Sequence, residues 1–189
     1  KNGKVFLKTP NGELQIELFG EHNMKNLQGA KLILEKLGIT EEMFYEAIQT
    51  FKGASKRLET LGSNSNTHIY RDFAHAPSKV GATTNATKEL YPKRKLVACY
   101  ELHTFSSLNK EFLPHYDQKL ADADLAIVFF SPHTLEMKKM PALDNEEIKA
   151  FFGREDLLVF TDAMELENFL KSQNWFQSNL LLMSSGTFG

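Results

Sequence analysis

Several features are scarce or absent in this sequence of 189 residues. It has a single cysteine, Cys99, so no disulfide framework can form, and the reducing cytoplasm is the expected compartment. No apolar run approaches the roughly 20 residues that a membrane-spanning helix needs. The formal net charge is only -2, which gives no reason to expect a nucleic acid or an acidic membrane surface as partner. These absences favour a globular protein with neither partner.

Two further absences bear on function. The sequence contains no Gly-rich Walker loop, so nothing in it cradles a triphosphate unaided. It begins with Lys1 rather than Met, and it shows no signal peptide. We interpret the chain as a fragment of a longer protein or a processed product.

The first 53 residues predict a β-hairpin followed by two helices. Apolar residues alternate on both sides of a Thr-Pro-Asn-Gly turn at residues 9–12, and Asn-Gly is a strong hairpin signal because both residues tolerate a positive φ. Apolar residues then recur at helical spacing from Leu27 to Leu37, before Gly38. Thr40 is suited to cap a second helix, which Gly53 would end. This unit is small for a domain and resembles the end of a larger one.

From about residue 54, five short apolar runs alternate with helical patterns. The runs are Ile69–Phe73, Leu96–Tyr100, Leu125–Phe130, Leu157–Phe160 and Leu180–Met183. The predicted helices are Pro77 to Leu90, Ser106 to Leu120 with a break at Pro114, Asp144 to Gly153, and a segment that carries Leu166, Phe169 and Leu170. This alternation predicts an α/β Rossmann-like fold with a mostly parallel sheet and helices on both faces. We therefore expect two parts, residues 1–53 and residues 54–189.

Polar side chains follow these strands at the points where the strands end. Because the carboxyl ends of parallel strands meet at one edge of a sheet, where ligands bind, Asp72, His75 and His103 are expected to line one crevice. Each residue also has a purely structural explanation: an Asx turn for Asp72, and a turn or cap for either histidine. Thr104 and Ser106 favour capping the next helix. Histidines on different loops carry no ligand-spacing signature, so no metal site is predicted.

A second polar cluster opens the first predicted helix. His22 and Asn26 are four residues apart and Asn23 and Asn26 three, so all three can share one helix face. Asparagine amides can pair with the donor and acceptor edge of an adenine, although Asn23 could equally cap the helix. Arg57, between the two parts of the chain, could bind phosphate or ribose or could be a solvated charge.

Taken together, these motifs resemble those of the Mur ligase family. Residues 20–27 (Gly-Glu-His-Asn-Met-Lys-Asn-Leu) resemble the G-x-H-N-x-x-N-x segment near the end of the family's central ATPase domain, and residues 56–59 resemble the basic Arg-x-Glu motif that opens its C-terminal domain. Residues 71–77 resemble the family's Asp-aromatic-small-His-His-Pro turn, with Ala76 in place of the second histidine. Residues 101–108 and 182–189 are most similar to the murein peptide ligase branch.

The resemblance implies a C-terminal fragment of an ATP-dependent ligase that joins a tripeptide amine to the carboxylate of UDP-N-acetylmuramate through an acyl phosphate. Residues 1–53 would end the central ATP-binding domain and residues 54–189 would form the peptide-binding domain. The main elements that bind ATP and Mg²⁺, and the UDP-sugar domain, would lie upstream in the same polypeptide. The fragment is therefore expected to be inactive by itself.

The resemblance also assigns roles to individual residues. A first group would contact ATP and a second group would contact the cell-wall peptide, and no residue of the chain is assigned to a metal. The nucleotide group is His22, Asn23, Asn26, Arg57 and Asp72. The peptide group is His75, His103, Thr104, Ser106 and Ser107.

Three alternatives remain open at this point. The chain could belong to another Mur ligase, such as a UDP-N-acetylmuramate–L-alanine ligase. It could be a non-catalytic Rossmann-like module that holds a nucleotide or a small anion. It could also be a hydrolase with Asp72 or Asp162 as nucleophile, which ranks lowest because the spacing fixes neither a base nor a second carboxylate.

Overall fold

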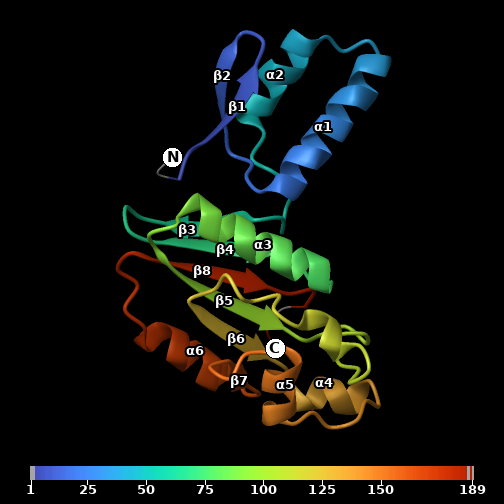
Figure 1. Cartoon of the computed structure of the whole chain (residues 1–189), viewed down its shortest axis with the longest axis vertical. Coiled ribbons are helices and arrows are strands. Elements are labelled where there is room, and N and C mark those ends of the chain that lie inside the picture. Colours follow the sequence, from blue (N-terminus) through green and yellow to red (C-terminus); the bar gives the residue numbers. More distant parts are fainter. Residues whose placement is uncertain (1–2, 187, 189) are drawn as a thin grey trace.

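The protein has two lobes along its long axis (Figure 1). A computed structural model describes residues 3–186 and residue 188. The first lobe contains strands β1 (Val5–Thr9) and β2 (Gly12–Ile16) and helices α1 (Glu21–Lys36) and α2 (Glu41–Thr50). Buried side chains from β2 and both helices form its small core: Ile16, Leu27, Phe44 and Ile48.

The predicted hairpin is confirmed, with its turn shifted by one residue. Thr9 pairs with Gly12, so Pro10 and Asn11 form the loop, and Gly12 opens β2 with a φ of 124° that favours glycine. Gly38 follows α1 at a φ of 86°, as expected for a helix end. The Thr40 hydroxyl accepts a hydrogen bond from the Met43 amide and caps α2. That helix ends at Thr50, three residues before the predicted stop.

The second lobe is built on a six-stranded sheet. Its strands are β3 (Glu59–Ser63), β4 (His68–Asp72), β5 (Lys95–Glu101), β6 (Leu125–Phe129), β7 (Leu158–Phe160) and β8 (Ser178–Met183), in the order β3-β4-β8-β5-β6-β7. The five predicted strands are all present, and neighbours among them are parallel. Strand β3 was not predicted, and it pairs antiparallel with β4. This edge strand has the sequence Glu-Thr-Leu-Gly-Ser and offers no apolar run.

Helices cover both faces of the sheet, as predicted. The second lobe contains α3 (Pro77–Leu90), α4 (Pro132–Met137), α5 (Asn145–Phe151), α6 (Ala163–Ser172) and the short 3₁₀ helix η1 (Leu113–Tyr116). Alternate residues of β5 divide between two cores: Ala98 packs with α3, α4 and α5 on one face, whereas Cys99 packs with α6 on the other. None of the helices in the described part of the chain is long and apolar enough to span a membrane.

The prediction of a helix from Ser106 to Leu120 is wrong, because this segment folds as turns around η1. Three local features explain the difference. The Ser107 side chain bonds to the Thr104 backbone and so competes with a helical ladder. Pro114 lacks an N–H, and Gln118 has a positive φ of 57°. The short helix α4 was not predicted.

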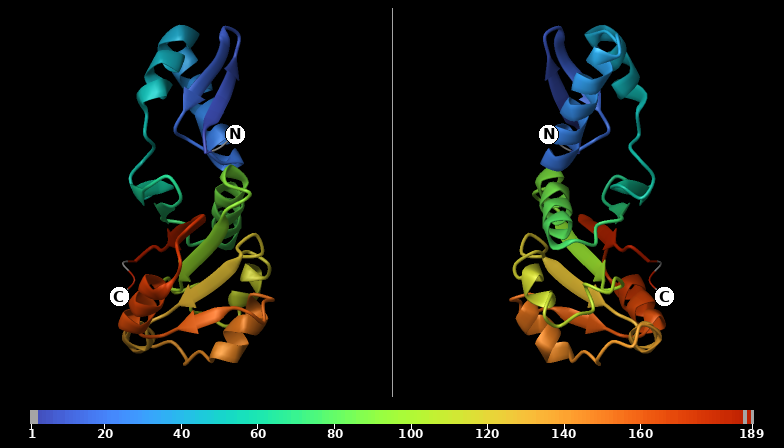
Figure 2. Two further views of the ribbon diagram at one scale, coloured as in Figure 1. Left: turned by 90° about the vertical axis from the view of Figure 1, so that its left-hand side faces the viewer. Right: turned by 90° about the vertical axis from the view of Figure 1, so that its right-hand side faces the viewer.

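Residues 51–58 connect the two lobes. Figure 2 shows this segment along one flank, while the start of α1 lies above α3. Edge-to-face packing of Phe19 on Tyr70, with ring centroids 5.4 Å apart, also joins the lobes. Side-chain packing against β4 therefore holds the first lobe in place, in addition to the connecting segment.

Two buried tyrosines support the turn that follows β4. The Tyr116 hydroxyl donates to the His75 carbonyl at 2.5 Å, and the Tyr100 hydroxyl lies 2.8 Å from both of these groups. The two rings are 5.3 Å apart between centroids and pack beneath the turn. Burial raises the pKa of both phenols, so they remain neutral donors at physiological pH.

We expect Tyr116→Phe to lower the free energy of unfolding by about 1 kcal/mol, because it removes a hydroxyl that bonds within the core and leaves the ring in place. Urea denaturation measures this change. Tyr100→Phe should have an effect of similar size, since its hydroxyl shares the same carbonyl. Unchanged denaturation midpoints in both variants would contradict this account of the turn.

Candidate functional site

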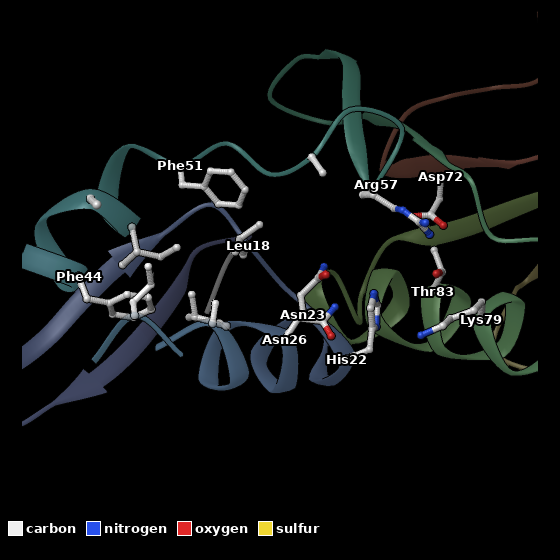
Figure 3. A pocket seen from close by; sticks show the side chains of 16 residues that line it. Leu18, His22, Asn23, Asn26, Phe44, Phe51, Arg57, Asp72, Lys79 and Thr83 are labelled. Atoms are coloured by element: carbon white, nitrogen blue, oxygen red, sulfur yellow. The ribbon is translucent and has the colours of Figure 1, made fainter. Parts of the chain in front are cut away.

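A cavity of about 630 Å³ lies between the two lobes. Residues of α1, α2, the connecting segment, β4 and α3 contribute its walls (Figure 3). The full lining is Leu18, His22, Asn23, Asn26, Leu27, Ala30, Leu34, Phe44, Ala47, Ile48, Phe51, Ala54, Arg57, Asp72, Lys79 and Thr83. It includes all five residues that the resemblance assigns to the nucleotide and none of the five assigned to the peptide.

The cavity has an apolar end and a polar end. Leu18 and Phe44 of the first lobe and Phe51 at the start of the connecting segment surround the apolar end. Arg57 and Asp72 lie at the other end (Figure 3). A ligand with a flat, weakly polar ring system and a charged extension matches this division. Small-molecule sites commonly have such mostly apolar walls with a few convergent polar groups.

The three polar residues at the start of α1 lie on one face, as their spacing predicts. Asn23 does not cap the helix: its Nδ2 donates to the Phe19 carbonyl at 2.8 Å, and Gly20 occupies the N-cap position. That bond leaves the Asn23 side-chain oxygen available as an acceptor. Within the described residues the Asn26 amide has no hydrogen-bond partner, so its donor and acceptor are both available.

Asp72 is buried at the end of β4 and holds the chain around it in place. One carboxylate oxygen accepts a hydrogen bond from the Leu58 amide at 2.7 Å, and the other accepts from the Ala74 amide at 2.7 Å. The second bond is the Asx turn that the sequence allowed as a structural explanation. Burial raises the pKa of this carboxyl group, against the opposing effects of the two amides and of nearby Arg57.

The Asp72 carboxylate also fixes the direction of Arg57. Lys56 and Leu58, on either side, have positive φ values of 56° and 47°, which are strained for residues other than glycine. The Leu58 bond to Asp72 and a 2.8 Å bond from the Phe73 amide to the Lys56 carbonyl hold this backbone. The Arg57 guanidinium lies 5.5 Å from the centre of the Phe73 ring, at the polar end of the cavity.

His22 is uncharged in this setting at neutral pH. Its half-buried position lowers its pKa below the ordinary value of 6.5, and the positive charges of Lys79 and Arg57 lower the pKa further, although Asp72 acts in the opposite direction. A neutral imidazole offers one donor and one acceptor to a ligand. Because the unfolded chain binds the proton more readily, this residue also makes the fold less stable as pH falls below 6.5.

We expect the His22 imidazole to titrate below pH 6.5 in a nuclear magnetic resonance experiment. Arg57→Ala and Lys79→Ala should each raise its midpoint, because each removes a positive charge from the cavity. Lys93→Ala is the matched control, since this exposed lysine does not line the cavity. A wild-type midpoint above 6.5 would contradict the proposed electrostatics.

The residues assigned to the peptide lie outside the cavity. Ser107 is fully buried, and its hydroxyl and amide both bond to Thr104, so these residues close a turn rather than cap a helix. Ser106 is exposed, with its hydroxyl 3.1 Å from that of Thr104. His75 has its Nδ1 2.9 Å from the Phe73 carbonyl. Of the hydroxyl residues, Thr104 and Ser106 remain accessible to a ligand.

Glu101, at the end of β5, supports the region around His103. Its carboxylate is buried and accepts hydrogen bonds from the Ser184 hydroxyl and from the Phe188 amide. The His103 Nδ1 lies 3.6 Å from the other carboxylate oxygen. Gly186 passes so close to the imidazole that an added Cβ would lie 2.8 Å from Nδ1. The chain after β8 therefore limits where this histidine can lie.

The cavity contains two polar residues that the sequence analysis did not assign, Lys79 and Thr83. Both lie on α3, four residues apart, and so on one face of that helix. The helix itself was predicted from Pro77, so this spacing could have identified the pair. No sequence pattern indicated, however, that this face of α3 lies opposite α1.

Two other kinds of site, a metal site and a second cavity, have less support. In the described part of the chain, no three His, Cys, Asp or Glu side chains are arranged to hold a metal ion. A second cavity of about 830 Å³ lies beside α6, around Trp175 and strands β3, β4 and β8. None of the ten residues assigned from the sequence lines it. The cavity between the lobes is therefore the candidate site.

Known proteins resemble this chain over most of its length. No protein-family model matches it. The UDP-N-acetylmuramate–L-alanine ligase of Carboxydothermus hydrogenoformans is 27% identical over 175 residues, which cover 93% of this chain and 36% of the relative. The ligase of the same name from Agathobacter rectalis is 31% identical over 176 residues, 92% of this chain and 38% of the relative. These similarities support the Mur ligase family.

Solved structures of the Mur ligase family share the fold. The UDP-N-acetylmuramate–alanine ligase of Thermotoga maritima matches with a TM-score of 0.72 at 20% identity, over 93% of this chain and 37% of that one. The murein peptide ligase of Psychrobacter arcticus matches with a TM-score of 0.62 at 19% identity, over 94% and 36%. The Rossmann-like fold is thus confirmed. The chain spans little more than a third of the length of these proteins.

Proposed function

We propose that this chain is the C-terminal part of an ATP-dependent Mur ligase that forms an amide bond in bacterial peptidoglycan metabolism. The observation that carries the proposal is the meeting of three distant segments around one cavity. These are the start of α1, the connecting segment with Arg57, and the end of β4 with Asp72. The volume of about 630 Å³ suits a nucleotide-sized ligand.

In this proposal the base of ATP lies near α1. The free amide of Asn26 pairs with the adenine edge, and the side-chain oxygen of Asn23 accepts from its amino group. His22, as a neutral imidazole, packs beside the ring. Arg57 contacts the ribose or a phosphate, and Asp72 reaches the nucleotide from the second lobe while it holds the connecting segment.

The reaction follows from the chemistry of amide formation. The carboxylate of UDP-N-acetylmuramate attacks the terminal phosphate of ATP, which releases ADP and leaves an acyl phosphate. The amine of the peptide then adds to the acyl carbon, and the tetrahedral intermediate expels phosphate to leave the amide. This chain contributes by positioning the nucleotide and the amine. The described residues provide no ligand set for the Mg²⁺ that the resemblance implies, so no step is assigned to it.

We place the amine substrate at the sheet edge beside His75, His103, Thr104 and Ser106. Ser107, which is buried and hydrogen-bonded, supports the turn rather than contacting the peptide. The proposed amine is that of a recycled L-Ala-γ-D-Glu-meso-diaminopimelate tripeptide, as in the murein peptide ligase branch. The proposed domain boundary lies between residues 53 and 54. Upstream domains supply the rest of the site, and the proposed compartment is the cytoplasm.

A second candidate is a UDP-N-acetylmuramate–L-alanine ligase, because both reported curated relatives carry that name. The hydrolase hypothesis has no support from the contacts of its two candidate nucleophiles. The Asp162 carboxylate accepts a hydrogen bond from the Glu165 amide and caps α6. Both oxygens of Asp72 accept hydrogen bonds from backbone amides, so neither is free to act as a nucleophile.

Incubation of the full-length protein with ATP, UDP-N-acetylmuramate and either the tripeptide or L-alanine tests the proposal. We expect phosphate release with the tripeptide and little with L-alanine. The reverse preference would establish the second candidate. The 189-residue chain alone should release none, and ATP-dependent product from it would contradict its assignment as part of a larger site.

The division of labour between the two residue groups can be tested in the same protein. We expect His103→Ala to raise the KM for the tripeptide about 10-fold through loss of one polar contact, with the KM for ATP unchanged. Arg57→Ala should instead lower turnover, because it removes a contact with ATP. Equal effects of each variant on both substrates would show that the two groups do not act separately.

A further inference from the structure

We propose that Lys79 binds the phosphate chain of the nucleotide in the cavity between the lobes. This inference rests on the proposed function and extends it to a residue outside the motifs that carry the family resemblance. Lys79 lies in the first turn of α3, facing the start of α1 across the cavity. Figure 3 shows its amino group directed toward His22.

The Lys79 ammonium has no protein partner in the part of the chain that the structure describes. Lys88, on the same helix, is by contrast paired with Asp124 at 2.6 Å. The buried carboxylate on the cavity wall, Asp72, is committed to the amides of Leu58 and Ala74. Lys79 can therefore bind an anion without breaking an existing ion pair.

Charge in the cavity favours an anion at this end. Arg57 and Lys79 are positive, Asp72 is the one acidic residue of the lining, and His22 is neutral at physiological pH. One positive charge remains in excess. An ammonium and a guanidinium on opposite walls suit a phosphate chain, because each can donate hydrogen bonds to separate oxygens.

The order of groups along the cavity sets the direction of the ligand. Phe44 at the apolar end and the amide of Asn26 belong to the first lobe, whereas the two cations belong to the connecting segment and α3. A nucleotide whose base lies against α1 thus extends its phosphates toward Lys79 and Arg57. Thr83, one turn after Lys79, adds a hydroxyl to the same wall.

Titration of the full-length protein with adenosine and with ADP, followed by isothermal titration calorimetry, tests this assignment. The wild type should bind ADP more tightly than adenosine. Lys79→Ala should weaken ADP binding about 5-fold and leave adenosine binding unchanged, because it removes one charge contact with phosphate. Lys79→Arg should retain most of the ADP affinity. Lys93→Ala, the matched control for charge, should bind both ligands like the wild type.

The possible results separate the two proposals. If Asn26→Ala weakens adenosine and ADP alike but Lys79→Ala weakens neither, the nucleotide site stands and the role of Lys79 is wrong. An equal loss of both ligands in Lys79→Ala would also overturn that role, because it would indicate a structural effect. If the wild type binds neither ligand, the nucleotide site and the role of Lys79 are both wrong.

Discussion

The arrangement of the candidate site depends on the carboxylate of Asp72. It accepts the amides of Leu58 and Ala74, and so ties the connecting segment to the turn after β4. Without it, two amides at this junction would lose their partners, at a cost of about 1–3 kcal/mol each if they stayed buried. The direction of Arg57 depends on the first bond, and the approach to α3 depends on the second. The buried carboxylate of Asp72 therefore holds together the two parts of the cavity wall that carry Arg57 and Lys79.

The electrostatic character of the cavity depends on how far each charged side chain is exposed to solvent. Burial lowers the pKa of His22, and the exposed side chains of Arg57 and Lys79 line the same cavity. Asp72 carries the opposite charge, but its oxygens are occupied by backbone amides. The cavity thus combines an apolar end with a cationic end, a pairing that suits a nucleotide better than a neutral metabolite.

Local sequence patterns predicted secondary structure correctly where the apolar pattern and the capping residues indicate the same element. Four of the five parallel strands were predicted from unbroken apolar runs, and the helix predicted from Asp144 is present as α5, where Asp144 and Glu147 form a capping box. Prediction failed between Ser106 and Leu120, where side-chain bonds within the turn and Pro114 outweigh helical periodicity. It also missed β3, whose stability comes from pairing with β4 and not from its own composition.

Sequence patterns predicted the five parallel strands, most helices, and the positions of His22, Asn26 and Arg57 on their elements. They also placed Asp72 at the end of a strand and revealed the resemblance to Mur ligases. Folding brings β8 between β4 and β5 and places the start of α1 opposite α3 across a cavity, and no sequence pattern predicted either arrangement. The physical reason is that periodicity records which face of an element is buried, but not which other element buries it. Lys79 was therefore visible in the sequence as a helix residue, and became a candidate ligand-binding residue only when α3 was seen to face α1.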